Sequence, residues 1–337
     1  MTLFSVYKCF VASRSRFSII SDMISAEDIK QKAFQLGFDL VGITDASPLD
    51  TKQCELFADW LSSGFAGRMG YMNCNIDKRT NPAKILENAQ SVICLGLNYT
   101  PPKTQKEPAA FANPMGKVAN YAQYEDYHTF IKKHLRELID FINSVSESTF
   151  DFKICVDSSP LAERAFAARA GLGFIGKNHM LINPKLGSQI LLGEIITTLK
   201  LQNDEPIKMD CSDCKKCLTA CPTGALRHDG YFDANKCISY LTIEYKGEIP
   251  INLAEKINNH LFGCDECVLA CPYQANAPEC RSEQFRFYSN RAKLNLNRIL
   301  DMTQDDFETF FADSSFLRLG LNLLKRNAKI CLDNISR

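Results

Sequence analysis

The sequence predicts three parts: a mixed α/β domain, a small cysteine-rich module and a short helical segment at the C-terminal end. Short apolar runs alternate with segments of helical spacing as far as about residue 205, which is typical of an α/β domain. Eight cysteines then stand between Cys211 and Cys271, and the remainder from Phe285 has a helical pattern. We expect the three parts to span residues 23–205, 206–284 and 285–337.

The α/β domain is predicted to open with a helix and a buried strand. Ser25 and Asp28 have the spacing of a capping box, and Gly37 marks the end of the helix that follows. The apolar run 38–44 then predicts a strand, and residues 50–62 predict a second helix.

The next stretch is predicted to contain a helix, a strand and a surface loop. Asn81-Pro82 favours a helix start, because proline suits the first helical position. Residues 91–97 predict a second buried strand. Residues 100–117 hold four prolines, which favours a surface loop.

The second half of the domain continues the alternation. Residues 126–145 have apolar side chains at helical spacing, and residues 152–156 predict a third strand. Pro160 favours the first position of a helix over 160–170, which makes Ser159 the expected N-cap. Residues 189–198 predict a further strand.

The cysteine-rich module carries two related runs. The first is C-x2-C-x2-C-x3-C-P, and the second repeats its last three cysteines and its proline at the same spacing. Leu261 stands where the second run would have its first cysteine, and Cys237 lies upstream as the substitute. This is the two-cluster ferredoxin pattern, in which the last cysteine of each run ligates the other run's cluster. We therefore assign one 4Fe–4S cluster to Cys211, Cys214, Cys217 and Cys271, and the second to Cys221, Cys237, Cys264 and Cys267.

Zinc and disulfides are the alternative uses of these cysteines. Zinc sites usually pair two C-x2-C units and have no use for the x3-C-P ending. Disulfides need an oxidising compartment, and the other seven of the 15 cysteines are scattered and odd in number. The pattern therefore indicates iron–sulfur clusters in a reducing cytosol.

Asp157 is the candidate for chemistry outside the cysteines. It stands where strand 152–156 ends and the next helix begins, and active sites of open α/β sheets lie at the carboxyl ends of strands. Helix capping is the alternative role, but a cap at Ser159 would leave the Asp157 carboxyl free. Glu163 and Arg164, at neighbouring helix positions, are interpreted as structural.

Two further motifs are incomplete. Gly171, Gly173 and Gly176 have the spacing G-x-G-x-x-G, but they follow a helix, whereas the dinucleotide fingerprint follows a strand. We interpret them as backbone that lies close to another large cofactor. Asp126-Tyr127-His128 has the D-x-H of proteins that bind cobalamin through a histidine, yet Ile131 stands where that motif has glycine. We therefore expect that His128 does not ligate cobalt.

The chain resembles the epoxyqueuosine reductase family from Met23 to the C-terminal end. The resemblance rests on residues 37–44, 70–72, 121–122, 126–128, 156–158, 170–178 and 236–244, the last of which surround Cys237. Family members usually have an arginine before the Tyr121-Ala122 pair and a small residue after it, where this chain has Asn120 and Gln123-Tyr124.

The resemblance implies a fold, a reaction and a site. The α/β domain would be nitroreductase-like and hold cobalamin, and the ferredoxin-like module would pass electrons to its cobalt. The enzyme, an oxidoreductase, would reduce epoxyqueuosine at the wobble position of tRNA, the last step of queuosine biosynthesis, with Asp157 as proton donor. The implied cobalamin contacts are Tyr121, His128, Gly171, Gly173, Gly176 and Lys177.

The expected partners are a tRNA anticodon loop and an external electron donor such as a reduced flavoprotein. Formal net charge is zero, so an RNA partner requires a local basic face. Residues 281–337 carry 10 Lys and Arg against 7 Asp and Glu, a modest excess. No apolar stretch approaches the length of a membrane span, and we expect a cytoplasmic monomer.

The first 22 residues are interpreted apart from the three predicted parts. Residues 1–22 carry no acid before Asp22, and Met23 directly precedes the helix opening, so we interpret them as an over-long gene start or a disordered extension.

A reductive dehalogenase, similar in its use of cobalamin with two clusters, is the alternative enzyme, although the twin-arginine signal typical of that class is absent. A non-enzymatic electron-transfer subunit is the alternative from another class.

Overall fold

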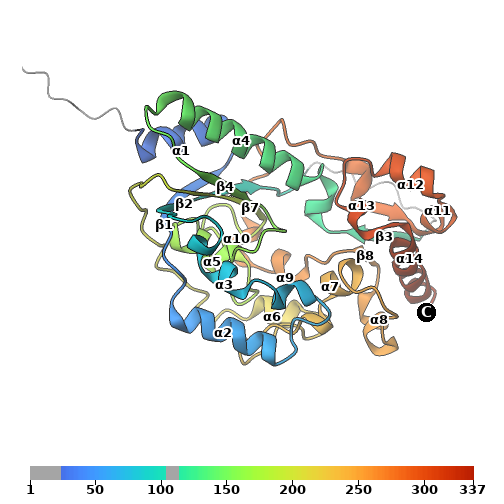
Figure 1. Cartoon of the computed structure of the whole chain (residues 1–337). Coiled ribbons are helices and arrows are strands. Elements are labelled where there is room, and N and C mark those ends of the chain that lie inside the picture. Colours follow the sequence, from blue (N-terminus) through green and yellow to red (C-terminus); the bar gives the residue numbers. More distant parts are fainter. Residues whose placement is uncertain (1–23, 104–113) are drawn as a thin grey trace, which may run out of the picture.

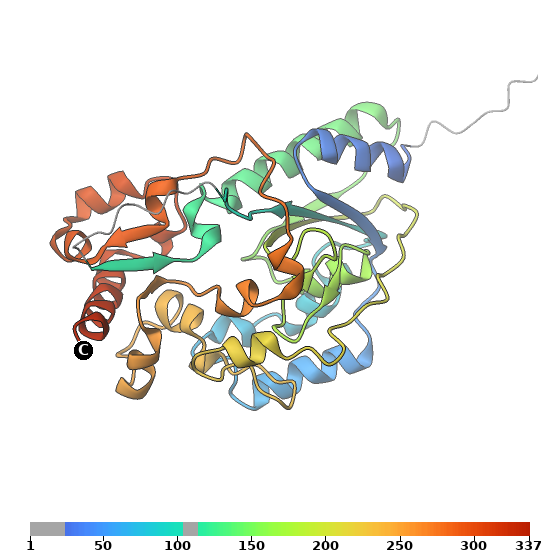
Figure 2. The same cartoon turned by 180° about the vertical axis from the view of Figure 1, so that it is seen from behind.

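The computed structural model describes residues 24–103 and 114–337. Figures 1 and 2 show these residues from opposite sides, with helices above and below a sheet and the C-terminal helices gathered at one end. In this described part of the chain no helix is long and apolar enough to cross a membrane. The predicted extension 1–22 lies outside the described residues, as does much of the predicted loop 100–117.

A four-stranded sheet forms the centre of the α/β domain. Its strands, in spatial order, are β1 (Leu40–Asp45), β2 (Ser91–Asn98), β7 (Ile190–Thr197) and β4 (Phe152–Cys155). All neighbouring pairs are antiparallel. The central strands β2 and β7 are almost entirely buried, which explains their continuous apolar sequences. The mixed class of helices and strands is confirmed, with antiparallel pairing in the sheet.

Helices cover both faces of this sheet (Figure 1). On one face, α1 (Ala26–Gln35) and α4 (Tyr127–Val145) bury a core that includes Ile93 and Ile195. On the other face, α5 (Glu163–Arg169) packs against side chains such as Cys94. Successive side chains of a strand point to opposite faces, so each of these strands contributes to both cores.

Short elements connect the sheet strands. The predicted capping box at Ser25 is confirmed, with the Ser25 side chain and Asp28 bonded to each other's backbone N–H. Asp50 caps the predicted second helix. The connecting elements are α2 (Thr51–Ser62), η1 (Gly70–Asn73), α3 (Ile76–Thr80), η2 (Pro82–Lys84), η3 (Asn120–Gln123), β5 (Phe174–Ile175) and β6 (Leu181–Ile182).

The cysteine-rich module consists of short helices joined by loops. Three of the cysteines assigned to clusters from the sequence lie at helix boundaries: Cys221 follows α6, Cys237 precedes α7, and Cys271 precedes α10, which has Pro272 in its first turn. The elements are α6 (Lys216–Ala220), η4 (Ala234–Lys236), α7 (Ile238–Ile243), α8 (Ile251–Ile257), α9 (Glu266–Leu269) and α10 (Pro272–Ala275).

A second sheet brings together strands from all three predicted parts. β3 (Met115–Val118) lies between β8 (His260–Phe262) and β9 (Lys293–Asn295). Leu261 of β8 is fully buried against Gly116, so its position faces the core of this sheet. Besides β9, the C-terminal segment contains η5 (Ser289–Arg291), α11 (Leu296–Asp301), α12 (Gln304–Phe310), α13 (Phe316–Leu319) and α14 (Leu321–Ile335). The domain limits after residues 205 and 284 stay predictions.

Several local predictions were wrong. The helix expected over 160–170 begins only at Glu163, and Ser159 does not cap it, because the Ala162 N–H bonds to the Arg79 carbonyl instead of continuing a helix. Asn81-Pro82 opens a single 3-10 turn. Residues 115–117 belong to a strand instead of a loop, and β9 interrupts the segment expected to be helical. β3 pairs with both β8 and β9, so hydrogen bonds between neighbouring strands satisfy the backbone groups of β3 and β9. Tertiary pairing of this kind overrides local propensity.

Candidate active site

Asp157 lies just beyond the end of β4, in the loop that leads to α5. Its φ angle is 51°, in the left-handed region that residues other than glycine adopt rarely. Its side chain is 41% exposed. The strand end therefore presents a carboxyl group at an open face of the domain, held by a strained backbone.

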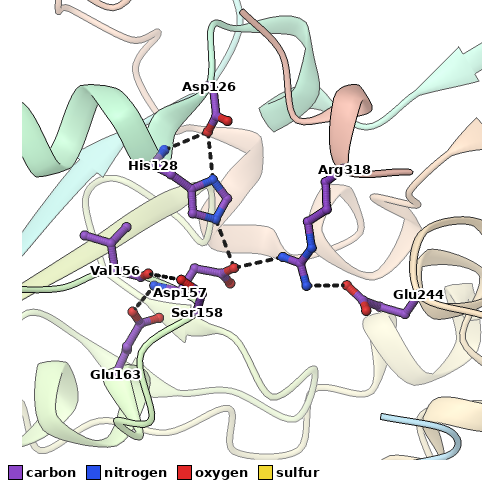
Figure 3. A network of polar contacts seen from close by, with 8 residues as sticks. All are labelled: Asp126, His128, Val156, Asp157, Ser158, Glu163, Glu244 and Arg318. Atoms are coloured by element: carbon purple, nitrogen blue, oxygen red, sulfur yellow. Dashed lines mark hydrogen bonds and ion pairs between the residues drawn. The ribbon is translucent and has the colours of Figure 1, made fainter. Parts of the chain in front are cut away.

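His128, near the start of α4, is bracketed by two carboxylates (Figure 3). Its Nδ1 lies 2.7 Å from Oδ1 of Asp126, and its Nε2 lies 3.0 Å from Oδ2 of Asp157. Asp126 is the N-cap of α4 and also accepts the backbone N–H of His128 at 2.9 Å. The helix cap thus orients the imidazole toward Asp157.

Arg318 and Glu244 reach the same carboxylate from distant parts of the sequence. Nη1 of Arg318, in α13, lies 3.3 Å from Oδ2 of Asp157. Its Nη2 lies 3.1 Å from Oε1 of Glu244, the C-cap residue of α7. Figure 3 shows Arg318 between the two acids. The network therefore joins the α/β domain, the cysteine-rich module and the C-terminal segment.

The charges of the network are set by these contacts. Burial alone would raise the pKa of Asp157, but the hydrogen bond and charge of His128, together with Arg318, hold it below its ordinary value. Burial alone would lower the pKa of His128, but its bonds to Asp126 and Asp157 raise it to about 9. At neutral pH the Asp157 carboxyl is thus ionised, and the neighbouring imidazole carries the proton.

Glu163 contacts the backbone of Asp157, on the side opposite its carboxyl group. Its Oε1 accepts a hydrogen bond from the backbone N–H of Asp157 (Figure 3). The sequence interpretation of Glu163 as merely structural missed this contact. Arg164 donates to the carbonyl of His179 at 2.5 Å, which agrees with a structural role.

Aromatic rings line the path from His128 to the cysteine-rich module. Tyr127 stacks on His128 with ring centroids 4.1 Å apart, and Tyr121 meets Tyr127 edge-on. Tyr121 also contacts Phe262, two residues before Cys264, with ring centroids 6.2 Å apart. The expected site residue Tyr121 therefore lies between His128 and the second set of cysteines, which comprises Cys221, Cys237, Cys264 and Cys267.

The first set of cysteines lines one cavity. The cavity measures about 320 Å³, and its walls include Cys211, Cys214, Cys217 and Cys271. The lining joins three cysteines of the first run with the last cysteine of the second. The donor set fits the predicted exchange of the fourth ligand between runs.

The second set of cysteines also gathers in one place. The pKa of Cys267 is raised by burial and by the neighbouring thiols Cys237, Cys264 and Cys221. Cys237 is the only one of these that lies outside the two runs. Its place beside Cys264 supports the substitution that the sequence pattern required.

Lys177 lies next to Cys211 and Cys214. The N–H of Lys177 points to the Cys211 sulfur at 3.4 Å, and its Nζ donates to the carbonyl oxygens of Ser212 and Cys214. Lys177 therefore belongs to the surroundings of the first cysteine set, where such bonds orient ligands and tune a cluster.

The glycine spacing is explained by packing within the chain. A side chain at Gly171 would come within 2.6 Å of the Glu205 carbonyl oxygen, and one at Gly173 within 2.4 Å of the Ile182 carbonyl oxygen. At Gly176 it would meet the Ile182 side chain at 2.3 Å. Close approach of the protein's own backbone, and at Gly176 of the Ile182 side chain, is thus sufficient to require glycine here, and that these glycines also lie against a cofactor stays a prediction.

Comparison with known proteins identifies the family. Residues 79–158 match the family model described as Epoxyqueuosine reductase QueG, DUF1730, and residues 210–274 match that of a 4Fe-4S double cluster binding domain. The epoxyqueuosine reductase of Cyclobacterium marinum is 38% identical over 302 residues, covering 89% of this chain and 94% of that protein. That of Leadbetterella byssophila is 39% identical, covering 90% and 96%. The chain belongs to the epoxyqueuosine reductase family.

Solved epoxyqueuosine reductases share the fold of this chain. The structure from Streptococcus thermophilus superimposes with a TM-score of 0.85 at 32% identity, covering 92% of this chain and 81% of that one. A crystal structure with an epoxyqueuosine-modified tRNA-Tyr stem loop has a TM-score of 0.86 at the same identity and coverage. A third, from Bacillus subtilis, has its catalytic aspartate loop swung out of the active site, with a TM-score of 0.85 at 32% identity and the same coverage.

Membership of the epoxyqueuosine reductase family makes this chain an oxidoreductase with a double-cluster module. Sequence reasoning placed Tyr121, His128 and Asp157 in the site, and the structure brings these three together. It missed Arg318, which belongs to no local motif, and it did not single out Glu244, which ends the stretch 236–244.

Proposed function

We propose that this chain reduces epoxyqueuosine in tRNA to queuosine, with electrons from two 4Fe–4S clusters and cobalamin as the reducing cofactor. The observation that carries the proposal is the His128–Asp157 pair, which holds a proton beside an exposed carboxylate at the end of β4. A solved relative holds an epoxyqueuosine-modified tRNA stem loop, and another is described by its catalytic aspartate loop. Asp157 is the aspartate of the strand-end loop in this chain.

The reaction consumes two electrons and two protons. Both carbon–oxygen bonds of the epoxide break, a carbon–carbon double bond forms, and the oxygen leaves as water. An acid within reach of the leaving oxygen lowers the barrier, because the oxygen otherwise departs with a full negative charge. Asp157 is the proposed proton donor to that oxygen.

Asp157 and His128 act as a unit in this proposal. Because the carboxyl is ionised while the imidazole is protonated, the proton passes from His128 Nε2 to Asp157 Oδ2 and from there to the leaving oxygen. Asp126 bonds to Nδ1 of the imidazole and stabilises the ring both before and after Nε2 gives up its proton. Arg318 balances the negative charge that remains on Asp157.

The two sets of cysteines hold the proposed clusters. Cys211, Cys214, Cys217 and Cys271 ligate one, and Cys221, Cys237, Cys264 and Cys267 ligate the other. Support comes from the cavity that the first set lines and from the thiols that surround Cys267. The Tyr121 ring between Phe262 and Tyr127 brings the surroundings of the second cluster next to the site.

The residues present fit a cobalamin that receives no ligand from His128. Both imidazole nitrogens are engaged by carboxylates, so neither is free to bind cobalt. Tyr121, His128, Lys177 and the glycines at 171, 173 and 176 stay the proposed neighbours of the cofactor, although Lys177 and the glycines also have close contacts within the chain. When bound, cobalamin supplies the strongly reducing cobalt centre.

The two alternatives are less consistent with the site. A reductive dehalogenase is disfavoured by membership of the epoxyqueuosine reductase family. A non-enzymatic electron-transfer subunit is disfavoured by the His128–Asp157 pair, because an electron carrier does not need a proton donor. We further propose that the protein is a cytoplasmic monomer and takes its electrons from an external donor such as a reduced flavoprotein.

One turnover assay tests the proposal. Protein reconstituted with iron, sulfide and cobalamin is mixed with a chemical reductant and a tRNA anticodon stem loop that carries epoxyqueuosine. We expect queuosine in the digested RNA and no change in a loop that carries guanosine. Absence of queuosine, with both clusters and cobalamin present in the absorption spectrum, would overturn the proposal.

A further inference from the structure

Asp157 is held through its backbone as well as through its carboxyl. Its N–H donates to Oε1 of Glu163, the first residue of α5 (Figure 3). This bond closes the loop of residues 157–162 onto the helix that follows. Because a φ of 51° is unfavourable for aspartate, the surroundings must impose it, and the bond to Glu163 is the contact of the Asp157 amide that does so.

A second carboxyl, Glu194, lies behind Glu163 in the middle of β7. Glu194 is fully buried, and neither of its carboxyl oxygens has a hydrogen-bond partner within the described residues. Its register partners are Cys94 in β2 and Cys155 in β4, so it points to the face of the sheet that α5 covers. An apolar side chain would fill this place at a lower cost of burial, so packing does not explain a carboxyl here.

The two glutamates differ in charge. Burial and the charge of Glu163 raise the pKa of Glu194 well above its ordinary value, so Glu194 stays neutral. Burial and the charge of Asp157 raise the pKa of Glu163 to about 7, although its bond to the Asp157 N–H and the charges of Arg164 and His128 lower it. The thiols of Cys94 and Cys155 and the Tyr127 hydroxyl also face these acids. Of the two glutamates, Glu163 is therefore the one that carries negative charge from about neutral pH upward, next to the N–H that it accepts.

We propose that Glu163 is a positioning residue for Asp157, and that the buried Glu194 is its electrostatic partner. The Glu163 carboxylate holds the Asp157 peptide in the left-handed conformation, and that conformation directs the Asp157 carboxyl to His128. Glu163 acts through Asp157 and does not itself donate to the leaving oxygen. This inference rests on the proposed function in that Asp157 is taken as the proton donor.

The first test measures the loop and needs no turnover. Hydrogen–deuterium exchange of the cluster-loaded protein is followed in peptides that cover residues 156–162. Glu163→Ala should speed exchange of the Asp157 amide by about 10-fold or more, because its acceptor is gone. Glu163→Gln keeps an acceptor oxygen and should retain most of the protection. The control is Glu137→Gln, an exposed carboxyl of α4 paired with Lys133, which should change nothing.

The second test separates positioning from simple stabilisation. With the epoxyqueuosine stem loop, Glu163→Ala should lower kcat by about 100-fold and leave KM for the RNA unchanged, since a displaced reacting group costs about that much. Glu163→Gln should recover most of kcat. A merely structural role predicts a lower melting temperature with normal kcat per cluster-loaded enzyme, and that result would overturn the proposal, as would unchanged exchange in Glu163→Ala.

Glu194 is tested by infrared spectroscopy. The wild-type protein should show the carbonyl band of a protonated carboxylic acid, and Glu194→Gln should remove it, because the amide carries no carboxylic acid group. A band that persists in Glu194→Gln would overturn the assignment. If the wild-type protein forms no queuosine, the proposed function fails, whereas the exchange and infrared results still decide whether Glu163 holds Asp157.

Discussion

Nε2 of His128 lies 3.0 Å from Oδ2 of Asp157, and Nδ1 of the same ring lies 2.7 Å from Oδ1 of Asp126. Two carboxylates from different elements therefore fix one imidazole, and each stabilises its protonated form. The contact links the start of α4 to the end of β4 and places a proton next to the exposed Asp157 carboxyl.

Replacing Asp157 with asparagine should lower turnover by about 10²–10⁴-fold, the usual contribution of a general acid, because the amide keeps the shape but does not release a proton. Cluster content, cobalamin content and affinity for the stem loop should stay near wild type. Single-turnover formation of queuosine measures the effect. Near-normal turnover would leave the carboxylate structural, since asparagine replaces aspartate well in a capping role.

His128→Ala should leave cobalamin bound with little change in its visible spectrum. The reason is that both ring nitrogens bind carboxylates, so cobalt receives no ligand from this residue. The absorption spectrum of the reconstituted variant checks this, and the spectral signature of a lost nitrogen ligand would contradict it.

The stabilising effect of His128 should depend on pH. Its pKa is about 9 in the folded protein and 6.5 in an unperturbed side chain, so the folded state favours the protonated form. The contribution is fully present below pH 6.5 and is lost as pH rises towards 9. The difference in melting temperature between wild type and His128→Gln should therefore be largest near pH 6 and shrink by pH 9. A difference that grows with pH would contradict the protonated imidazole.

Arg318→Ala should raise the pKa of Asp157, because one cation that favours its ionised form is removed. Because a proton donor works in its protonated form, the alkaline limb of the pH–turnover profile should move to higher pH. Arg318→Lys keeps the charge and serves as the matched control. An unshifted limb in Arg318→Ala would show that the contact does not influence Asp157.

Cys237→Ala should reduce the iron content by about half and abolish turnover, because Cys237 completes the second cluster where Leu261 replaces a cysteine. Iron analysis of reconstituted protein measures the loss. The control is Cys280→Ala, a partly buried cysteine outside both sets, which should keep both clusters. Full iron content in Cys237→Ala would refute the ligand assignment.

The sequence alone determined the features that depend on local spacing. The two cysteine runs, the capping box at Ser25 and the apolar period of residues 126–145 each reflect contacts made within a few positions along the chain. The strand end at Asp157 and the Asp126-Tyr127-His128 motif could be recognised from the sequence for the same reason. Family membership followed from such short stretches taken together.

Only the tertiary structure decided which distant groups meet. Arg318 and Asp157 are 161 positions apart and touch because α13 packs beside the module that follows the α/β domain. No local period records such a contact, and the same holds for β3, whose partners β8 and β9 come from later parts of the chain. The glycines at 171, 173 and 176 show the converse: their spacing suggested a cofactor, but the space that a side chain would take is filled by Glu205 and Ile182. Spacing along the chain reports the backbone conformation, whereas the identity of the neighbour is set by packing across it.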